Sequence, residues 1–422
     1  MSSSGRVHII GGGLAGLGAA VYLTQRGRDV TLYEGAPHFG GRCRSFYDKN
    51  LGMTIDNGSH LLLSGNHHTR DYLESIDATQ ELVIDGTSVF TFFDVAQQRF
   101  HSLRLNDGRV PWWMGRGFSD IRPRDYLALW RLFASRDKDR VADCFDVDTP
   151  LFRKLIEPLA VSVLNASADV ASARLLWAMV RRTLLRGGRF CRACHPRTNL
   201  SSTFVAPAVR WLQQKGVRLL LSKRVRALAA QDGRIKGVCL ADKTEPVDEE
   251  DAVIVAVPPD TAVGLVEGLA GRVPEGACAI VNVHFGVGLP PPPPNVRGRH
   301  KMIGLWGGVG HWIFVHRDHI SVTVSAAPPA LYADKAETAK RLWREVALTF
   351  SLDGARVPAY AFICEKKATF LQSPSNQRRR HGASTALGNL FLAGDWTDTG
   401  LPATIEGALA SGQNAAHNVL KG

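Results

Sequence analysis

The sequence predicts an α/β fold in which segments far apart along the 422 residues contribute to one domain. Three segments carry this prediction. Residues 7–34 have the pattern of a strand, a glycine turn, a helix and a second strand, because short apolar runs flank small and apolar residues at helical spacing. Residues 251–259 form an apolar run stopped by prolines, and residues 389–395 form a short run that ends in Gly-Asp.

A glycine motif connects the first predicted strand to the first helix. Gly11-Gly12-Gly13-Leu14-Ala15-Gly16 is the G-x-G-x-x-G pattern, and Glu34 follows at the end of the second strand, as a Rossmann-like nucleotide-binding unit requires. Gly11 permits the tight turn, Gly13 lets the backbone approach a pyrophosphate, and Gly16 lets the helix pack on the strand. The last three residues of the motif open a helix whose N-terminus stabilises negative charge. Glu34 is expected to accept hydrogen bonds from the adenosine ribose.

A second glycine turn, Gly40-Gly41-Arg42, begins six residues after Glu34. It places a guanidinium beside the same phosphates, where the guanidinium can pair with them bidentately. The first motif does not separate NAD from FAD, but a Gly-Gly-Arg turn in this position favours FAD. We therefore expect Gly41 and Arg42 to bind FAD.

The C-terminal part of the chain supplies a third element of the expected cofactor site. Gly394-Asp395 ends a predicted strand, where ligands meet parallel sheets, so that Asp395 can accept from a ribityl hydroxyl or bind near the pyrophosphate. A predicted helix follows over residues 404–420. Its first residues, Thr404 and Ile405, can direct backbone N–H groups at the flavin pyrimidine edge and stabilise the negative charge of a reduced flavin.

Together these motifs resemble the FAD-dependent amine oxidase and phytoene desaturase superfamily, whose pattern is G-x-G-x-x-G, E and G-G-R near the N-terminus and G-D, E-G-A and S-G near the C-terminus. The resemblance implies a Rossmann-like FAD-binding domain of the two-dinucleotide-binding type. An α+β substrate domain that includes a helical subdomain is interleaved with it. The resemblance also implies a backbone contact from Val225 to adenine, and further cofactor contacts from Gly58 and Ser59.

Within that superfamily the chain resembles the bacterial hydroxysqualene dehydroxylases, also called squalene-associated FAD-dependent desaturases. The similarity lies in residues 56–63, 158–165 and 394–404, of which the last segment is the most specific. The group often has proline where this chain has Ser59, so the local backbone is less rigid here.

The resemblance implies that hydroxysqualene and reduced flavin give squalene, water and oxidised flavin, a step toward hopanoid or sterol precursors. Loss of the hydroxyl gives a delocalised carbocation, to which N5 of the reduced flavin can deliver hydride. The protein must bury a long polyene, exclude water and supply one proton to the leaving oxygen. Desaturation of a polyprenoid of the phytoene type is the alternative, followed by an amine oxidase and by a non-catalytic FAD-binding escort protein.

Two polar side chains in residues 56–63 are candidate catalytic residues. His60 can orient or protonate the leaving hydroxyl. Asp56 has the same ambiguity as His60, because either side chain can instead be structural, with its hydrogen bonds satisfied inside the protein. The sequence leaves both alternatives open.

We expect the FAD-binding domain to be discontinuous, over residues 1–80, 200–285 and 385–422. The substrate-binding domain then takes residues 81–199 and 286–384, with a helical part at about 115–195. The proline run Pro290–Pro294 cannot be a central strand and indicates a turn or a surface connector.

The amino-acid composition limits the classes of partner and the cellular compartment that we expect. The net charge of +12 favours anionic partners, but no zinc spacing, RRM signature or basic zipper is present, so we expect neither nucleic acid nor a metal. The seven cysteines are scattered without a disulfide framework, which favours the cytoplasm. No stretch of 18 apolar residues predicts a membrane span.

A lipid substrate and the basic charge together predict peripheral association with the inner face of the membrane. The arginines within residues 181–192 and Arg378, Arg379 and Arg380 can contact anionic lipid. Trp112 and Trp113 can anchor at the interface or belong to a core. Because no second nucleotide fingerprint for NAD(P)H is visible, we expect an external electron donor.

Overall fold

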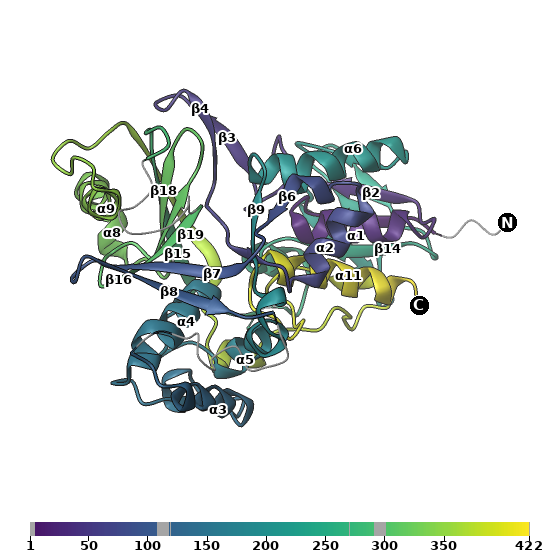
Figure 1. Ribbon diagram of the computed structural model, residues 1–422. Helices are drawn as coiled ribbons and strands as arrows, with labels where there is room; N and C mark the ends of the chain where they lie inside the picture. Colours follow the sequence, from purple (N-terminus) through teal and green to yellow (C-terminus); the bar gives the residue numbers. More distant parts are fainter. Residues whose placement is uncertain (1–4, 108–117, 119, 270, 291–300, 422) are drawn as a thin grey trace.

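The structure is a computed structural model that describes residues 5–107, 118, 120–269, 271–290 and 301–421. Trp112, Trp113 and residues 291–294 of the proline run lie outside the described residues, so the expectations for them stay predictions. The described chain contains a parallel sheet with its helices, a large mixed sheet and a group of short helices, seen at the right, left and bottom of Figure 1.

A parallel five-stranded sheet is the framework of the nucleotide-binding half of the described chain. Its central strand is buried along its whole length between two neighbours, which explains why three of its four residues, Val-His-Ile-Ile, are aliphatic. Segments from three distant parts of the chain build this sheet, as the sequence predicts. The strand order is β10 (Arg218–Leu220), β2 (Val30–Tyr33), β1 (Val7–Ile10), β14 (Ala252–Val255) and β20 (Leu390–Leu392).

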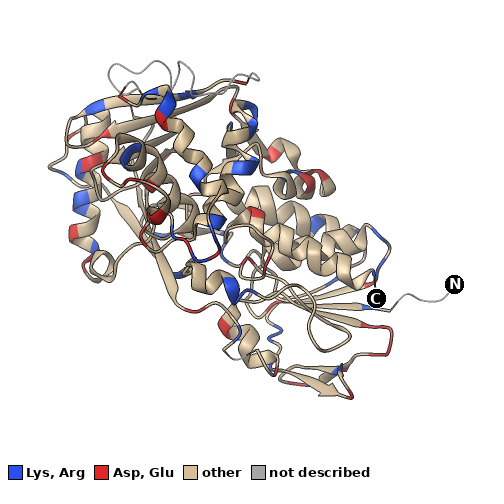
Figure 2. Cartoon of the chain, turned by 90° about the horizontal axis from the view of Figure 1, so that it is seen from below, with Lys and Arg blue, Asp and Glu red and all other residues tan. Residues whose placement is uncertain are grey.

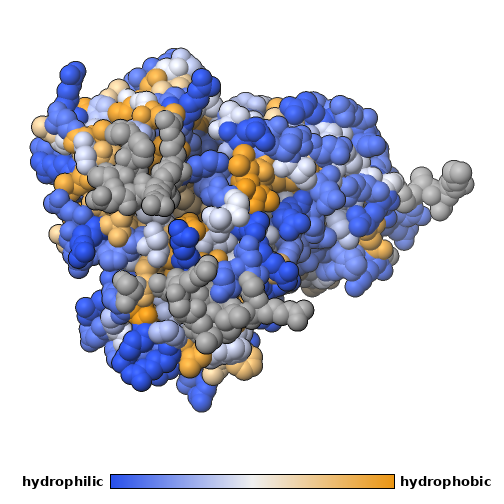
Figure 3. Space-filling view, viewed as in Figure 1, coloured by the Kyte–Doolittle hydropathy of each residue, from blue (hydrophilic) through white to orange (hydrophobic). Residues whose placement is uncertain are grey.

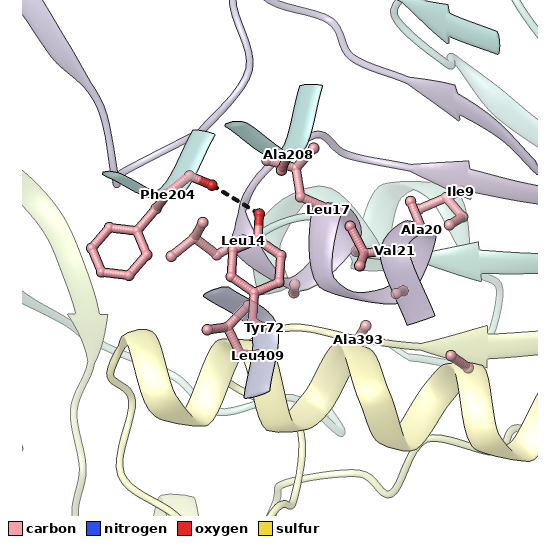
Figure 4. Close-up of a cluster of buried hydrophobic side chains, with 14 of the residues drawn as sticks. Ile9, Leu14, Leu17, Ala20, Val21, Tyr72, Phe204, Ala208, Ala393 and Leu409 are labelled. Atoms are coloured by element: carbon pink, nitrogen blue, oxygen red, sulfur yellow. Dashed lines mark hydrogen bonds between the residues drawn. The ribbon is translucent and has the colours of Figure 1, made fainter. Parts of the chain in front are cut away.

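The two faces of the parallel sheet are covered differently. Val7 and Ile9 face one core, which is shared with α1 (Leu14–Thr24), α2 (His67–Ser75), α6 (Ala206–Gln214) and α11 (Ile405–Val419). Figure 4 shows this core, in which the Tyr72 hydroxyl donates to the carbonyl oxygen of Phe204 at 2.8 Å. Ile10 faces the other core, formed with α7 (Pro259–Leu265) and the antiparallel strands β11 (Ala227–Gln231), β12 (Arg234–Cys239) and β13 (Thr244–Pro246).

Helices α1 and α11 approach each other closely because glycine lies at their contact. A Cβ atom at Gly412 would lie 2.2 Å from the carbonyl oxygen of Ala15, and one at Gly18 would lie 3.1 Å from the Leu409 side chain. Packing this close holds α11 directly against α1. The C-terminal helix is thereby fixed beside the glycine motif that opens α1.

A mixed seven-stranded sheet forms the second large element of the described chain. Its apolar face packs on α9 (Lys335–Phe350), and α8 (Pro329–Ala333) precedes that helix. The strand order is β19 (Tyr360–Phe370), β15 (Ala277–Phe285), β18 (Ile320–Val324), β17 (Trp312–Val315), β16 (Met302–Trp306), β7 (Ser88–Asp94) and β8 (Arg99–Leu105).

One predicted boundary differs from the structure at residues 277–285. The prediction placed these residues in the FAD-binding domain, yet β15 is hydrogen-bonded to β18 and β19 of the seven-stranded sheet. An apolar run predicts a strand, but it does not indicate which sheet that strand joins. The rest of the two-domain division stays a prediction.

The remaining elements are short. A hairpin of β3 (Ser45–Asp48) and β4 (Met53–Asp56) and a small sheet of β5 (Leu62–Leu63), β9 (Ala193–Pro196) and β6 (Leu82–Ile84) link the two large sheets. The helical group contains the 3₁₀ helix η2 (Pro123–Leu129), α3 (Trp130–Phe133), α4 (Glu157–Leu164) and α5 (Ala173–Arg182), and α10 (Pro374–Arg378) lies near the C-terminal strand. Within the described ranges, none of the helices combines the length and the apolar composition needed to cross a lipid bilayer.

Candidate functional site

The glycine loop after β1 has the shape that its motif predicts. Gly11 has a φ of +108°, and a Cβ there would lie 2.4 Å from the carbonyl oxygen of Ala256, so only glycine fits. A Cβ at Gly16 would lie 1.9 Å from the Gly11 carbonyl oxygen, so α1 can pack against the loop only without a side chain there. At Gly13, the N-cap of α1, no atom lies within 4 Å of the Cβ position. Leu14 and Ala15 begin a helix whose N-terminus is of the kind that binds phosphate, and no side chain of the N-cap residue covers it.

Glu34 lies beside this loop at the end of β2. Its carboxylate accepts from the Gly12 N–H at 2.8 Å and from the Ala36 N–H at 2.7 Å, and the side chain stays partly exposed. The Lys223 N–H donates to the Glu34 carbonyl oxygen at 2.9 Å, which brings the segment that leads to Val225 to the same place. The predicted ribose and adenine contacts are thus neighbours in the structure.

The Gly-Gly-Arg turn connects the N-terminal and C-terminal parts of the site. The Gly40 N–H donates to the Gly12 carbonyl oxygen at 2.8 Å, which places Gly41 against the glycine loop. The Arg42 guanidinium donates to the Asp395 carboxylate at 2.7 Å and also to the carbonyl oxygen of Ala368. Asp395 is buried and its negative charge raises the pKa of Arg42, whereas the Arg42 side chain is only half-buried. Two side chains that are 353 positions apart are therefore paired at one site.

The C-terminal segment presents a helix start beside that ion pair. Gly394 has a φ of +140°, and its N–H donates to the Ser411 hydroxyl of α11 at 2.8 Å. Thr404 caps α11, since its hydroxyl accepts from the Gly407 N–H at 3.2 Å, and Ile405 is the first helical residue. The N–H groups of Ile405 and Glu406 precede the first hydrogen bonds within the helix, so they can bind a ligand.

The structure places Arg380 differently from the sequence prediction. It was grouped with Arg378 and Arg379 as a basic surface cluster, but it is buried, and its guanidinium donates to the carbonyl oxygens of Thr397 and Leu401 at 3.0 and 2.8 Å. These bonds hold the loop after Asp395. A run of three arginines does not show which of them points inward, so the run alone could not reveal this role.

Residues 56–60 pass between the Arg42 turn and the seven-stranded sheet. The Asn57 amide donates to the Arg42 carbonyl oxygen at 3.3 Å. On the other side, the Ser59 and Ser321 hydroxyl oxygens are 2.6 Å apart, and a Cβ at Gly58 would lie 2.8 Å from the Asn282 amide nitrogen. The segment that contains Gly58 and Ser59 is therefore held between the Arg42 turn and the seven-stranded sheet.

Asp56 has its hydrogen bonds satisfied by the protein. One carboxylate oxygen accepts from the Ser45 hydroxyl at 2.6 Å and from the Leu200 N–H at 2.9 Å. Burial raises the pKa of Asp56 to about 6, although both bonds act in the opposite direction. This arrangement fixes the start of the 56–60 segment, and it favours the structural alternative for Asp56.

His60 lacks the positive charge that a histidine needs to act as a general acid near pH 7. Burial, and then the positive charge of Arg42, lowers the pKa of His60 to about 4. The imidazole is therefore neutral near pH 7, where it can orient a hydroxyl by a hydrogen bond but holds no extra proton to donate. The catalytic role of His60 stays a prediction.

Three buried histidines next to this segment were not singled out from the sequence. His284 is fully buried near the Asp56 backbone, and neither ring nitrogen has a partner of good hydrogen-bond geometry among the described residues. Its ring centre lies 5.3 Å from that of His319, which stacks on His316 at 4.1 Å. Burial lowers the pKa of His284 and of His316 to about 3.

The feature of the sequence that could have revealed this cluster is the presence of polar residues within two otherwise apolar strands. Asn282 and His284 on β15, and Ser321 and Thr323 on β18, are polar residues two positions apart, so each pair points to one face of the sheet. That face lies against residues 56–60. In the part of the chain that the structure describes, no group of three or more His, Cys, Asp or Glu side chains could hold a metal ion.

Comparisons with known proteins show the family and the fold of the chain. The family described as flavin containing amine oxidoreductase matches residues 14–420. A hydroxysqualene dehydroxylase of Sinorhizobium fredii is 39% identical over 413 residues, which are 97% of each chain, and one of Zymomonas mobilis is 38% identical over 414 residues with the same coverage. Among solved structures, cyclohexylamine oxidase from Brevibacterium oxydans matches 99% of each chain with a TM-score of 0.72 at 16% identity, which shows the shared fold.

We predict that Glu34→Ala and Arg42→Ala each reduce the FAD that the purified protein retains. Each change removes charge-assisted hydrogen bonds, which should cost about 1.5–3 kcal/mol of binding free energy, or roughly ten- to a hundredfold in the dissociation constant. Flavin absorbance per protein measures the retention. Asp29→Ala, which removes an exposed carboxylate just before β2, is the control. A full flavin complement in both variants would contradict the assignment.

We also predict a specific loss of stability in acid. The pKa values of His60, His284, His311 and His316 are all lowered by burial, whereas an unfolded histidine titrates near 6.5. The unfolded state therefore binds more protons below pH 6.5, so stability is fully present above that pH and is lost as the pH falls toward the folded values.

The test of this acid effect is His284→Leu, which removes one of the four groups. Its unfolding free energy should fall less steeply than that of the wild type between pH 6.5 and 4, by up to about 1.4 kcal/mol per pH unit. Urea unfolding at several pH values measures the slopes, and His417→Leu on the exposed side of α11 is the matched control. Equal slopes for His284→Leu and wild type would show that His284 does not contribute.

Proposed function

The chain belongs to the flavin-containing amine oxidoreductases and, within them, to the hydroxysqualene dehydroxylases, and on that premise we propose that it reductively removes the hydroxyl group of hydroxysqualene to give squalene. It is an FAD-dependent oxidoreductase. The similarity to the named dehydroxylases over 97% of the chain is the observation that carries the proposal, because it includes the substrate-domain segments in which flavoproteins of one fold differ.

The proposed reaction balances without a further reactant. The C–O bond of the substrate breaks, a C–H bond forms, and the leaving oxygen takes one proton to become water, while the flavin is oxidised by two electrons. Bound in its reduced form, FAD supplies the hydride. The protein must orient the hydroxyl, provide the proton and keep water away from the reacting carbon.

The residues proposed to hold the cofactor come from loops and helix starts in distant parts of the chain. The N-terminus of α1 at Gly13 takes the phosphates, Glu34 the ribose and Val225 the adenine. Arg42 and Asp395 supply charge near the pyrophosphate and the ribityl chain, with Gly58 and Ser59 beside them. The first turn of α11, at Thr404 and Ile405, directs N–H groups toward the flavin ring. The empty contact shell at Gly13 supports this assignment, because a side chain there would fill the space a phosphate needs.

His60 is proposed to orient the substrate hydroxyl as a neutral imidazole. Its position in the segment beside Arg42 and its lowered pKa support orientation over donation of a proton from an imidazolium. Asp56 is proposed to hold the same segment through Ser45 and Leu200.

The proposal also includes two features of the cellular setting. An external electron donor reloads the flavin after each turnover. The protein works at the inner face of the membrane, because a C30 hydrocarbon alcohol partitions into bilayers. The net charge of +12 supports an encounter with anionic lipid.

We predict that the protein, reduced under anaerobic conditions, converts hydroxysqualene to squalene in one turnover, with the flavin absorbance returning as product forms. Mass spectrometry of the extracted lipid identifies the product, and protein with oxidised flavin is the control. No squalene from the reduced protein would contradict the proposal. A dehydrogenated polyprenoid formed by the oxidised protein would instead show a desaturase.

A further inference from the structure

The helical segment from Pro123 to Phe133, formed by η2 and α3, is apolar on two faces. Tyr126, Leu129 and Leu132 are buried in the core of the helical group. At the same three-residue spacing, Leu127, Trp130 and Phe133 are 54%, 51% and 60% exposed. Residues three apart lie on one side of a 3₁₀ helix, and about one turn apart in an α-helix, so the second set forms a stripe facing solvent.

This stripe is a structured surface and not a loose end. The Trp130 and Phe133 rings lie 6.2 Å apart, and Phe133 packs edge-on at 5.5 Å against Trp177 of α5, which is itself almost buried. These ring contacts hold the exposed apolar side chains against α5. Figure 3 shows hydrophobic surface at the lower end of the molecule, where Figure 1 places α3.

Basic side chains lie beside the stripe. Arg124 and Arg131 are exposed on the same segment, and Arg181 lies four residues after Trp177 on the exposed side of α5. Among the nearby acids, Asp125, Asp137 and Asp143 are paired with Arg122, Arg174 and Arg140, whereas Asp139 and Asp146 line one hollow with Arg131. Among the described residues no ion pair involves Arg124, Arg131 or Arg181. Figure 2 shows Lys and Arg in blue and Asp and Glu in red along the chain.

We propose that Leu127, Trp130 and Phe133 insert into the surface of an anionic lipid bilayer, with Arg124, Arg131 and Arg181 at the level of the head groups. An element that is apolar on both its faces requires an apolar environment on the outer one. Exposed aromatic rings with unpaired arginines beside them fit the interfacial region of a membrane, which offers hydrocarbon and negative charge together.

This surface deepens the proposed function, on which it rests in one respect: a bilayer-soluble substrate gives the protein a reason to dock. It shares only Arg181 with the basic clusters that the sequence indicated. Arg380 of the C-terminal cluster is buried, and Arg192 of the other is paired with Asp107 at 2.5 Å.

Sedimentation with vesicles tests the proposal. The full-length holoprotein is mixed at low salt with vesicles of phosphatidylcholine alone, and with vesicles of equal parts phosphatidylcholine and phosphatidylglycerol. We expect the wild type to sediment with the anionic vesicles and Trp130→Asp/Phe133→Asp to lose about tenfold or more in the partition coefficient. Leu348→Asp, which changes a 42% exposed leucine on α9, is the matched control and should bind like the wild type.

Two further measurements keep the result interpretable. Flavin content and circular dichroism show whether the double variant is folded, and Leu127→Asp provides a milder variant of the same stripe. Binding of the double variant equal to that of the wild type would overturn the proposal, as would a wild type that stays in the supernatant. A wild-type dimer that the double variant converts to a monomer, without vesicle binding by either, would overturn it in favour of a contact between two copies. Turnover of hydroxysqualene in detergent micelles reports on the proposed function separately, because it needs no vesicle.

Discussion

The ion pair between Arg42 and Asp395 is the interaction on which the rest of the site depends. Arg42 belongs to a turn that is hydrogen-bonded to the glycine loop, and Asp395 follows the last strand of the parallel sheet. The pair fixes two loops, and each loop carries part of the expected cofactor contacts. Because Asp395 is buried and Arg42 is half-exposed, the guanidinium keeps donors free for a ligand while the carboxylate is held in place.

The glycines make that pairing possible by letting the two helices beside it approach. Without side chains at Gly16 and Gly412, α1 packs against both the glycine loop and α11. The 56–60 segment is hydrogen-bonded to the Arg42 carbonyl oxygen at one end and to the polar face of the seven-stranded sheet at the other. An open contact shell remains at Gly13, at the start of α1. The candidate site is thus built on elements that are tightly packed against one another.

The parts that sequence reasoning predicted correctly are local. The strand, glycine loop, helix and acid of residues 7–34 follow from backbone rules that act over a few residues, and the helix predicted over 404–420 is observed as Ile405–Val419. Features that depend on contacts between distant parts of the sequence were harder to predict. The assignment of β15 to the seven-stranded sheet, the burial of Arg380 and the gathering of His284, His316 and His319 all depend on partners far away in the sequence. A short apolar strand or a run of arginines carries no record of those partners.

The central claim is that Arg42 and Asp395 act as one unit in holding FAD. A double-mutant cycle with Arg42→Gln, Asp395→Asn and the double variant, read as FAD dissociation constants, tests it most directly. The account predicts a coupling free energy larger than about 1 kcal/mol, because either single change already removes the pair. Effects of the two single changes that add within about 0.5 kcal/mol would show that the residues act independently, and would contradict the account.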